Sequence, residues 1–152
     1  MNQKLIREWK KVFRADLPYI VFELKELAKP PAMVILEGEV GAGKTTFTQA
    51  FLDDKEVMSP TYSIISEYKN FLHADFYRLE KNEEVLQLEL PNYLEDKQYF
   101  FAEWGMKFAR RIVRELPENF TPYLLHITVH ENGAVSPEGP SRDFKLYSLH
   151  DD

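Results

Sequence analysis

Residues 38–45 constrain the fold of this 152-residue chain more than any other feature. They read G-E-V-G-A-G-K-T, a complete G-x-x-x-x-G-K-[ST] loop, and they follow an apolar run at residues 33–36. Residues 44–52 then carry a helical pattern. A loop of this kind, set between a strand and a helix, wraps the phosphates of a nucleotide. The motif therefore predicts an α/β domain that binds a nucleoside triphosphate.

The residue types in this loop suit phosphate and magnesium. The glycines allow consecutive backbone N–H groups to face the phosphates, Lys44 reaches the β- and γ-phosphates, and the Thr45 hydroxyl ligates Mg²⁺. The helix that begins at the loop adds the positive end of its dipole. The expected nucleotide contacts are Glu39, Val40, Gly41, Ala42, Gly43, Lys44, Thr45 and Thr46.

Composition limits the class of protein. The chain is 44% hydrophobic, enough to bury one core, so a single domain over residues 1–152 is expected. The sequence contains no Cys and no run of about 18 apolar residues, which favours a cytoplasmic location over a secreted or membrane-spanning one. The net charge of -6 argues against direct nucleic-acid binding, because phosphate contacts need a basic surface.

Apolar periodicity predicts the order of the elements. A first helix is expected from the helical spacing of Leu5, Ile6, Trp9, Val12 and Phe13. The further expected elements are a helix from residue 16 to 28, a strand at 32–37, a helix at 44–52, a hairpin of strands 62–68 and 71–75, an acidic, less regular stretch at 80–96 broken by Pro91, a strand at 99–103, a helix at 109–116, and strands at 123–129 and 143–149. The expected fold class is α/β: a P-loop NTPase-like sheet of mixed parallel and antiparallel strands, flanked by helices on both faces.

Two acidic residues are candidates for the second half of the site. A working NTPase needs an acid at the C-terminal end of a neighbouring strand, near Mg²⁺ or the attacking water. Residues 71–75 and 99–103 each run from apolar residues into a carboxylate, Asp75 and Glu103. Either acid can instead be a helix N-cap or a surface charge at a strand end. Thr61 is either an ordinary turn threonine or a switch residue that brings a second hydroxyl to the metal or γ-phosphate.

Missing motifs exclude several classes of P-loop protein. The chain lacks the N-K-x-D stretch that reads guanine, so the expected cofactors are ATP and Mg²⁺, and it lacks the L-S-G-G-Q signature of transporter ATPases. A small-molecule kinase with an arginine-rich lid remains an alternative, as does a nucleotide-dependent switch with negligible turnover. The one comparable basic cluster recurs at i, i+3, i+4 and i+7, which favours a solvated helix face or a docking surface for an acidic protein or RNA. It consists of Lys107, Arg110, Arg111 and Arg114.

Four segments, in this order, resemble the TsaE (YjeE) family. They are the loop at 38–45, S-P-T-Y at 59–62, H-A-D-F-Y-R-L at 73–79 and E-W at 103–104. The third and fourth are far more specific than the loop. The resemblance implies a bacterial ATPase required for the threonylcarbamoyl modification of adenosine beside the anticodon of tRNAs that read codons starting with A. Such proteins work with TsaB and with TsaD, the transferase that acts on tRNA. The net charge of this chain predicts that its contact with tRNA is indirect, and the lack of a long apolar run predicts no membrane contact.

The resemblance also implies roles for individual residues. His73 is expected to place its imidazole in a hydrogen-bond network beside the site. No arginine finger is obvious, which predicts a low intrinsic ATPase rate that a partner raises. The implied assignments are Lys44 and Thr45 as phosphate and Mg²⁺ ligands, Thr61 as the switch threonine, Asp75 as the catalytic or switch acid, Glu103 as the Walker B-like carboxylate on the metal, and Trp104 close to the nucleotide.

Overall fold

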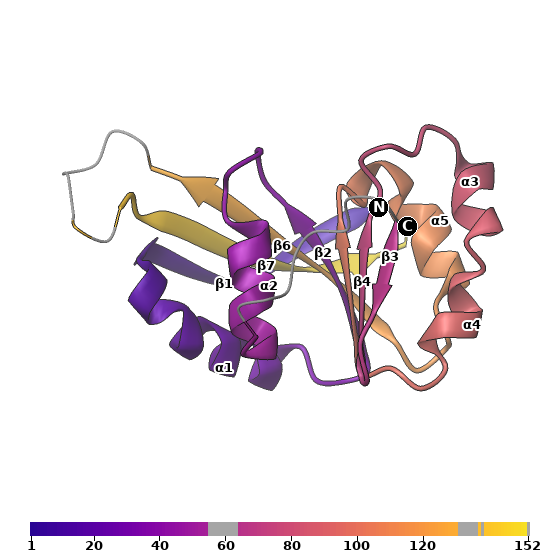
Figure 1. Ribbon diagram of the computed structural model, residues 1–152, viewed down its shortest axis with the longest axis horizontal. Coiled ribbons are helices and arrows are strands. Elements are labelled where there is room, and N and C mark those ends of the chain that lie inside the picture. Colours follow the sequence, from indigo (N-terminus) through magenta and orange to yellow (C-terminus); the bar gives the residue numbers. More distant parts are fainter. Residues whose placement is uncertain (55–63, 131–136, 138, 152) are drawn as a thin grey trace.

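A single seven-stranded sheet forms the centre of the computed structural model, which describes residues 1–54, 64–130, 137 and 139–151. The strands lie in the order β1-β7-β6-β2-β5-β4-β3 (Figure 1). Their bounds are β1 Asn2–Val12, β2 Ala32–Glu37, β3 Ile65–Glu67, β4 Phe71–Asp75, β5 Tyr99–Glu103, β6 Thr121–Val129 and β7 Arg142–His150. The strand that leads into the loop at 38–45, β2, is therefore the middle strand of the sheet.

The sheet mixes parallel and antiparallel pairs, as the sequence predicted. β2 runs parallel to β5 and β6, and β5 runs parallel to β4. β7 pairs antiparallel with β6 and β1, and β3 pairs antiparallel with β4. Because parallel strands end at the same edge, the residues that follow β2, β4 and β5 meet there, which is where ligands bind in sheets of this class.

Helices cover both faces of the sheet (Figure 1). One face carries α1 (Leu17–Leu27), after the 3-10 turn η1 (Arg14–Asp16), and α2 (Lys44–Leu52); the other carries α3 (Asn82–Gln87), α4 (Leu90–Leu94), η2 (Met106–Phe108) and α5 (Ala109–Glu115). Within β2, Val34 and Leu36 pack into the first core, whereas Met33 and Ile35 pack into the second. A strand buried on both faces reads as a continuous apolar run, which explains residues 33–36.

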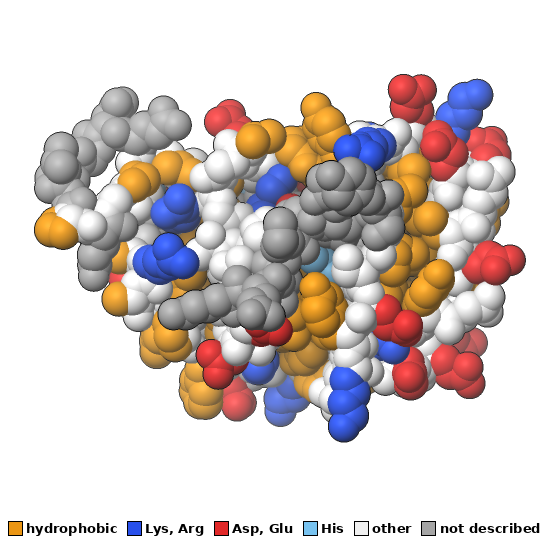
Figure 2. All heavy atoms as spheres, viewed as in Figure 1, with side chains coloured by type: hydrophobic (Ala, Val, Ile, Leu, Met, Phe, Trp, Pro, Cys, Tyr) orange, Lys and Arg blue, Asp and Glu red, His pale blue; other side chains and the backbone are white. Residues whose placement is uncertain are grey.

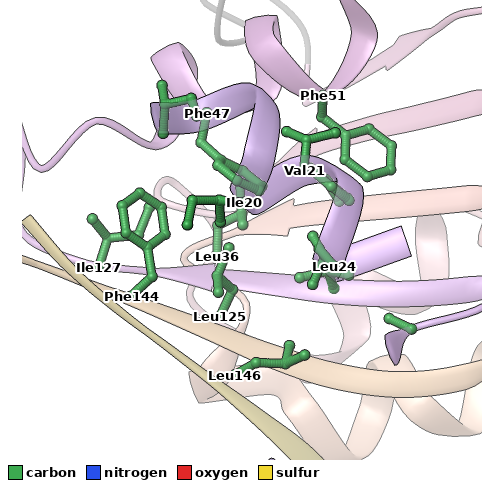
Figure 3. Packing of buried hydrophobic residues seen from close by; sticks show 14 of the residues in the cluster. Ile20, Val21, Leu24, Leu36, Phe47, Phe51, Leu125, Ile127, Phe144 and Leu146 are labelled. Atoms are coloured by element: carbon green, nitrogen blue, oxygen red, sulfur yellow. The ribbon is translucent and has the colours of Figure 1, made fainter. Parts of the chain in front are cut away.

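Aromatic rings fix α2 on the sheet. Figure 3 shows Phe47 reaching from the helix toward the strands that carry Leu36 and Phe144. The ring centroid of Phe47 lies 5.6 Å from that of Phe144 and 6.2 Å from that of Phe101, and Phe51 lies 4.6 Å from Phe101. Aromatic pairs of this kind stabilise the folded state by more than the burial of their surface area alone. This packing holds the start of α2, at Lys44, over the ends of the central strands.

The N-terminal segment corrects the prediction of a first helix. Residues Asn2–Val12 form the strand β1, which pairs with β7 at the edge of the sheet. The register shifts between Trp9 and Val12, at a bulge that places both side chains in one core. In a regular strand, residues three apart face opposite sides. The bulge therefore produced a spacing that imitates a helix, and pairing with a distant strand decided the outcome.

Three smaller predictions need adjustment. The hairpin is present, but its first strand is the short β3, and residues 55–63 lie outside the described part of the chain. The irregular stretch 80–96 contains α3 and α4, and Pro91 lies in the first turn of α4 instead of breaking a helix. Proline is tolerated there because a first-turn N–H has no partner within the helix. Lys107 belongs to η2, and α5 begins two residues later.

The described surface is unevenly charged. Figure 2 shows acidic side chains gathered over the end of the molecule formed by α3 and α4. Such a surface repels nucleic-acid phosphates at that end. Separately, the helices within the described residues are too short or too polar for any of them to cross a lipid bilayer.

Removing the Tyr99 hydroxyl tests how α1 is tied to the sheet. This hydroxyl donates a buried hydrogen bond of 2.9 Å to the carbonyl of Ala28, the C-cap of α1. Tyr99→Phe leaves that carbonyl unpaired and should lower the unfolding free energy by about 1–2 kcal/mol in chemical denaturation. Tyr77→Phe is the control, because the Tyr77 side chain is exposed, and it should cost less than about 0.5 kcal/mol. Equal costs would contradict the account.

Alkaline pH tests the burial of the same hydroxyl group. Burial raises the pKa of Tyr99 to about 12, whereas an unfolded tyrosine titrates near 10. The unfolded state therefore releases the proton first, so the wild-type protein loses stability as pH rises from about 10 toward 12. The Tyr99→Phe variant lacks this contribution, and its denaturation midpoint should fall less over that range.

Candidate functional site

The glycines of the loop at 38–45 set the backbone conformation that leads into α2. Gly43 caps the helix with φ of +107°, in the left-handed region that favours glycine. Gly38 approaches β6 so closely that a Cβ atom there would lie 2.8 Å from the carbonyl oxygen of Ile127. Substitution at either position would move the loop. Backbone N–H groups at the start of the helix are thus presented to the sheet edge, the arrangement that binds phosphate.

Lys44 is buried at the start of α2, and its ammonium faces the loop. The Nζ atom donates a 3.0 Å hydrogen bond to the carbonyl of Gly38 and lies 3.8 Å from the ring centroid of Trp104. Burial lowers the pKa of Lys44, and the charges of Glu103, Asp75 and Glu37 oppose this effect. Because burial still lowers the pKa of Lys44 despite these carboxylates, the negative charge of a polyphosphate would stabilise the ammonium further.

Asp75 and Glu103 lie side by side, as expected for acids at the ends of parallel strands. They are register partners at the last positions of β4 and β5. Burial raises the pKa of Asp75; a hydrogen bond of 3.0 Å from the Tyr77 backbone N–H opposes the rise, and the charge of Glu103 adds to it. Two adjacent carboxylates next to a buried lysine form a site that gains from a cation.

Glu103 is the more buried of the two acids, at 3% exposure. Its Oε2 lies 2.6 Å from Nε2 of His73, a residue that is itself fully buried. The structure thus shows the hydrogen bond beside the site that the sequence predicted for His73. Glu103 is thus a buried, hydrogen-bonded acid and not a surface charge, whereas Asp75 also accepts the local backbone bond of a turn residue.

Most of the predicted residues line one cleft of about 340 Å³. The lining set consists of Val40, Gly41, Gly43, Lys44, Thr45, Thr46, Asp75, Glu103, Trp104 and Arg142. Glu39 and Ala42 instead line a neighbouring hollow, with Val40, Gly41 and residues of β6. Thr61, the expected switch threonine, lies outside the described residues, so its role remains a prediction.

Trp104 is held at the cleft by an unusual backbone conformation. Its φ is +58°, a left-handed value that costs energy for a non-glycine residue and that often marks functional sites. Its ring lies 5.2 Å from the ring of Tyr77, whose side chain is 63% exposed. Tyr77 is therefore a surface residue beside the cleft, and Trp104 faces Lys44 instead of filling a core.

Arg142 is a site residue that the sequence did not reveal. It begins β7, and its Nε donates a 2.5 Å hydrogen bond to the carbonyl of Ala42. The same Nε would lie 3.0 Å from a Cβ atom at Gly43, so the guanidinium rests against the loop. Its only local signal is a basic residue after a Gly/Pro-containing turn, a hundred positions from the loop.

Replacing Arg142 tests whether it supports the loop. Arg142→Met removes a charge-assisted hydrogen bond from the carbonyl of Ala42 and should raise the Kd for ADP about tenfold, measured by calorimetry. The control is Arg110→Met on α5, where the Kd should stay unchanged. An unaffected Kd in Arg142→Met would mean that the loop holds its shape without this contact.

The oxygen donors in the cleft fit a magnesium ion. Mg²⁺ binds through one or two protein carboxylates together with water and phosphate oxygens. The cleft offers the Thr45 hydroxyl and the carboxylates of Asp75 and Glu103. Burial, and to a lesser extent the charge of Glu103, raises the pKa of Asp75, and a divalent cation would offset both effects.

The basic cluster does not line this cleft, although Lys107 donates a 3.3 Å hydrogen bond to the carbonyl of Tyr77 beside it. Lys107, Arg110, Arg111 and Arg114 line a separate hollow with Met1 and Asn82, and Arg111 forms an ion pair with Glu115 at 3.2 Å. These positions do not provide the arginine-rich lid over the nucleotide that a kinase uses.

Comparison with known proteins identifies relatives for most of the chain. A family model described as "Threonylcarbamoyl adenosine biosynthesis protein TsaE" matches residues 14–135. Proteins named "tRNA threonylcarbamoyladenosine biosynthesis protein TsaE" match from Bacillus subtilis (34% identity over 73% of this chain and 72% of the relative), Haemophilus influenzae (36% over 55% and 58%) and Nostoc (37% over 62% and 65%). The chain thus spans less than two thirds of the length of the second and third of these relatives.

A solved structure supports the fold. The crystal structure of YdiB from Bacillus subtilis superposes with a TM-score of 0.57 at 22% identity, over 99% of this chain and 89% of that protein. Arg142 lies beyond the residues that the family model matches, so that match gives no information about it.

Proposed function

Because this chain belongs to the TsaE family, we propose that it binds and hydrolyses ATP as a subunit required for the threonylcarbamoyladenosine modification of tRNA adenosine next to the anticodon. The names of its relatives place them in threonylcarbamoyladenosine biosynthesis. The observation that carries the ATPase part is the meeting of Lys44, Asp75 and Glu103 at one cleft on the P-loop. The proposed activity is low in the isolated chain and depends on Mg²⁺.

Different residues of the cleft are proposed to bind the phosphates and to orient the water that accepts the phosphoryl group. The loop N–H groups and Lys44 bind the phosphates and offset the charge that develops as the terminal phosphoryl group leaves. Asp75 is partly exposed at the cleft and has a raised pKa, so it is the group that orients the attacking water or the switch loop. Thr61 is proposed to complete the switch.

Magnesium would be held by Thr45 and Glu103. When bound, it would supply positive charge that polarises the phosphate oxygens. Glu103 is assigned to the metal because its carboxylate is buried and hydrogen-bonded to His73, whereas Asp75 is only partly buried. A crystal structure with Mg²⁺ in which Asp75 is the nearer acid would reverse the two assignments.

Replacing Glu103 tests this assignment. Glu103→Gln keeps the size of the side chain but replaces a charged carboxylate with a neutral amide, which is a weaker ligand for Mg²⁺. The variant should therefore require about tenfold more Mg²⁺ to reach half of the metal-dependent gain in ATP affinity. Calorimetry across a Mg²⁺ series, with an EDTA reference, measures it. Glu118→Gln, at an exposed position that does not line the cleft, is the control and should respond to Mg²⁺ as the wild type does. A normal response in Glu103→Gln would remove it from the metal site.

The proposed partners are TsaB and TsaD. The acidic surface at one end of the molecule disfavours tRNA binding there, so the tRNA is expected to contact TsaD and not this chain (Figure 2). The ATP-bound form is proposed to dock on the pair, and hydrolysis to reset the assembly.

The decisive experiment combines kinetics with nucleoside analysis. Steady-state ATPase activity is measured for the chain alone, with purified TsaB and TsaD, and with tRNA added, and tRNA from depleted cells is analysed by mass spectrometry. We expect the pair to raise the rate and depletion to remove threonylcarbamoyladenosine. An unchanged rate together with normal modification would refute the proposal, and phosphate transfer from ATP to a metabolite would then establish the kinase alternative.

A further inference from the structure

We propose that His73 is the positioning residue of Glu103: its imidazole fixes the carboxylate in the orientation that the Mg²⁺-nucleotide complex requires. The inference rests on the proposed function, because it assigns His73 a role only through the metal-binding role of Glu103. It concerns a buried polar group in the middle of a strand, where apolar residues are the rule.

The first observation is the position of His73. It lies in β4, two residues before Asp75, and its register partner in β5 is Phe101, two residues before Glu103. Alternation along a strand puts His73 on the same face as Asp75, and Phe101 on the same face as Glu103. That face is the one under α2, where Phe71 and Phe101 belong to the core and the ring of Phe71 lies 6.4 Å from His73. His73 therefore lies between the hydrophobic core and the cleft.

The second observation is the hydrogen bond itself. The Nε2 of His73 and the Oε2 of Glu103 are 2.6 Å apart, and the side chains are 0% and 4% exposed. An ionised carboxylate only accepts hydrogen bonds, so Nε2 is the donor. A short bond to an ionised acceptor in a buried place is among the stronger hydrogen bonds in proteins.

The third observation concerns the other ring nitrogen. Nδ1 of His73 is buried and makes no hydrogen bond within the described residues. Among the residues that the structure describes, the ring is thus oriented by packing and by its bond to Glu103. A buried imidazole with one strong bond, directed at an acid of the cleft, matches the outer-shell partners that orient metal ligands.

The consequence for the site is conformational. A glutamate has three rotatable side-chain bonds, and ordering them when the nucleotide binds would cost free energy. With one oxygen bonded to a rigid ring, the carboxylate is already ordered. Losing the partner should therefore weaken the response to Mg²⁺ and leave the loop's own affinity for phosphates unchanged.

The test compares two replacements that differ in one donor. His73→Gln places an amide N–H near the former Nε2, whereas His73→Leu keeps the volume and removes the donor. Calorimetry gives the affinity for ATP over a Mg²⁺ series and for ADP in EDTA. We expect His73→Leu to need about tenfold more Mg²⁺ for half of the gain in ATP affinity, and His73→Gln to stay within about threefold of the wild type.

Two further measurements separate positioning from a structural role. ADP affinity in EDTA should agree among the folded variants, because the loop is intact. In a double-mutant cycle, His73→Leu should add less to the Mg²⁺ defect of Glu103→Gln than it costs alone, since both changes act on the same metal ligand. Should His73→Leu fail to fold, His73→Asn, whose amide is too short to reach Oε2, takes its place.

Several results would overturn the inference. They are a normal Mg²⁺ response in folded His73→Leu with only a lower melting temperature, a defect in His73→Gln as large as in His73→Leu, or additive defects in the double mutant. If Glu103→Gln alone responds normally to Mg²⁺, the proposed metal role of Glu103 fails and this inference with it. A defect in Glu103→Gln without one in His73→Leu rejects the inference only.

Discussion

Lys44→Ala is expected to abolish measurable binding of ATP and ADP, a loss in affinity of at least about a hundredfold. The structure gives the reason: the ammonium is buried at the start of α2, bonded to one carbonyl and lying over the ring of Trp104. Burial lowers its pKa, so the group gains strongly from the negative charge of the phosphates. Titration calorimetry measures the loss directly.

A second buried lysine provides the control. Lys97 is also 6% exposed, but it lies before β5, at the opposite end of that strand from Glu103, and pairs with Glu67 at 2.9 Å and Asp96 at 2.7 Å. Lys97→Ala should reduce thermal stability and leave nucleotide affinity unchanged at a temperature where both variants are folded. Wild-type affinity in folded Lys44→Ala would exclude the loop from nucleotide binding.

Asp75→Asn is expected to reduce ATP turnover by about a hundredfold or more while ATP still binds. The amide keeps an oxygen that can accept the Tyr77 N–H bond, so the local backbone is preserved. What is lost is the negative charge that orients water or the switch loop. Single-turnover kinetics with pre-bound ATP separate this loss from any change in affinity.

The same substitution should stabilise the nucleotide-free protein at neutral pH. Burial, together with the charge of Glu103, raises the pKa of Asp75. The folded state then binds the proton more tightly than the unfolded state, so stability falls as pH rises above about 4, the range in which an unfolded aspartate ionises. Asp75→Asn avoids that loss, and its melting temperature should exceed that of the wild type at pH 7 and converge with it in acid.

Either of two results would contradict this account of Asp75. Normal ATP turnover in Asp75→Asn would show that Asp75 has no role in catalysis. A variant with no gain in melting temperature at pH 7 would mean that Lys44 and His73 already compensate the charge. Loss of activity together with a gain in stability is typical of a residue that serves catalysis at the expense of stability.

The sequence by itself determined the elements whose signals are local. The P-loop specifies its own turn and the start of α2 through glycines and a lysine at fixed spacing. The apolar run at 33–36 implies a strand buried on both faces, and the apolar runs that end in Asp75 and Glu103 placed both acids at strand ends. Each pattern placed a carboxylate at the end of its own strand, and the parallel order of β2, β5 and β4 then brings both acids to the edge where Lys44 lies.

Only the tertiary structure decided the features that depend on distant pairing. Trp9 and Val12 had a helical spacing, yet β1 forms because β7 offers an unpaired edge and a bulge brings both side chains to one core. Arg142 reaches the carbonyl of Ala42 from a hundred residues away, and His73 meets Glu103 because β4 and β5 are neighbours. Contacts of this kind leave no periodic trace in a sequence, since they arise from how strands are ordered and not from the residues beside them.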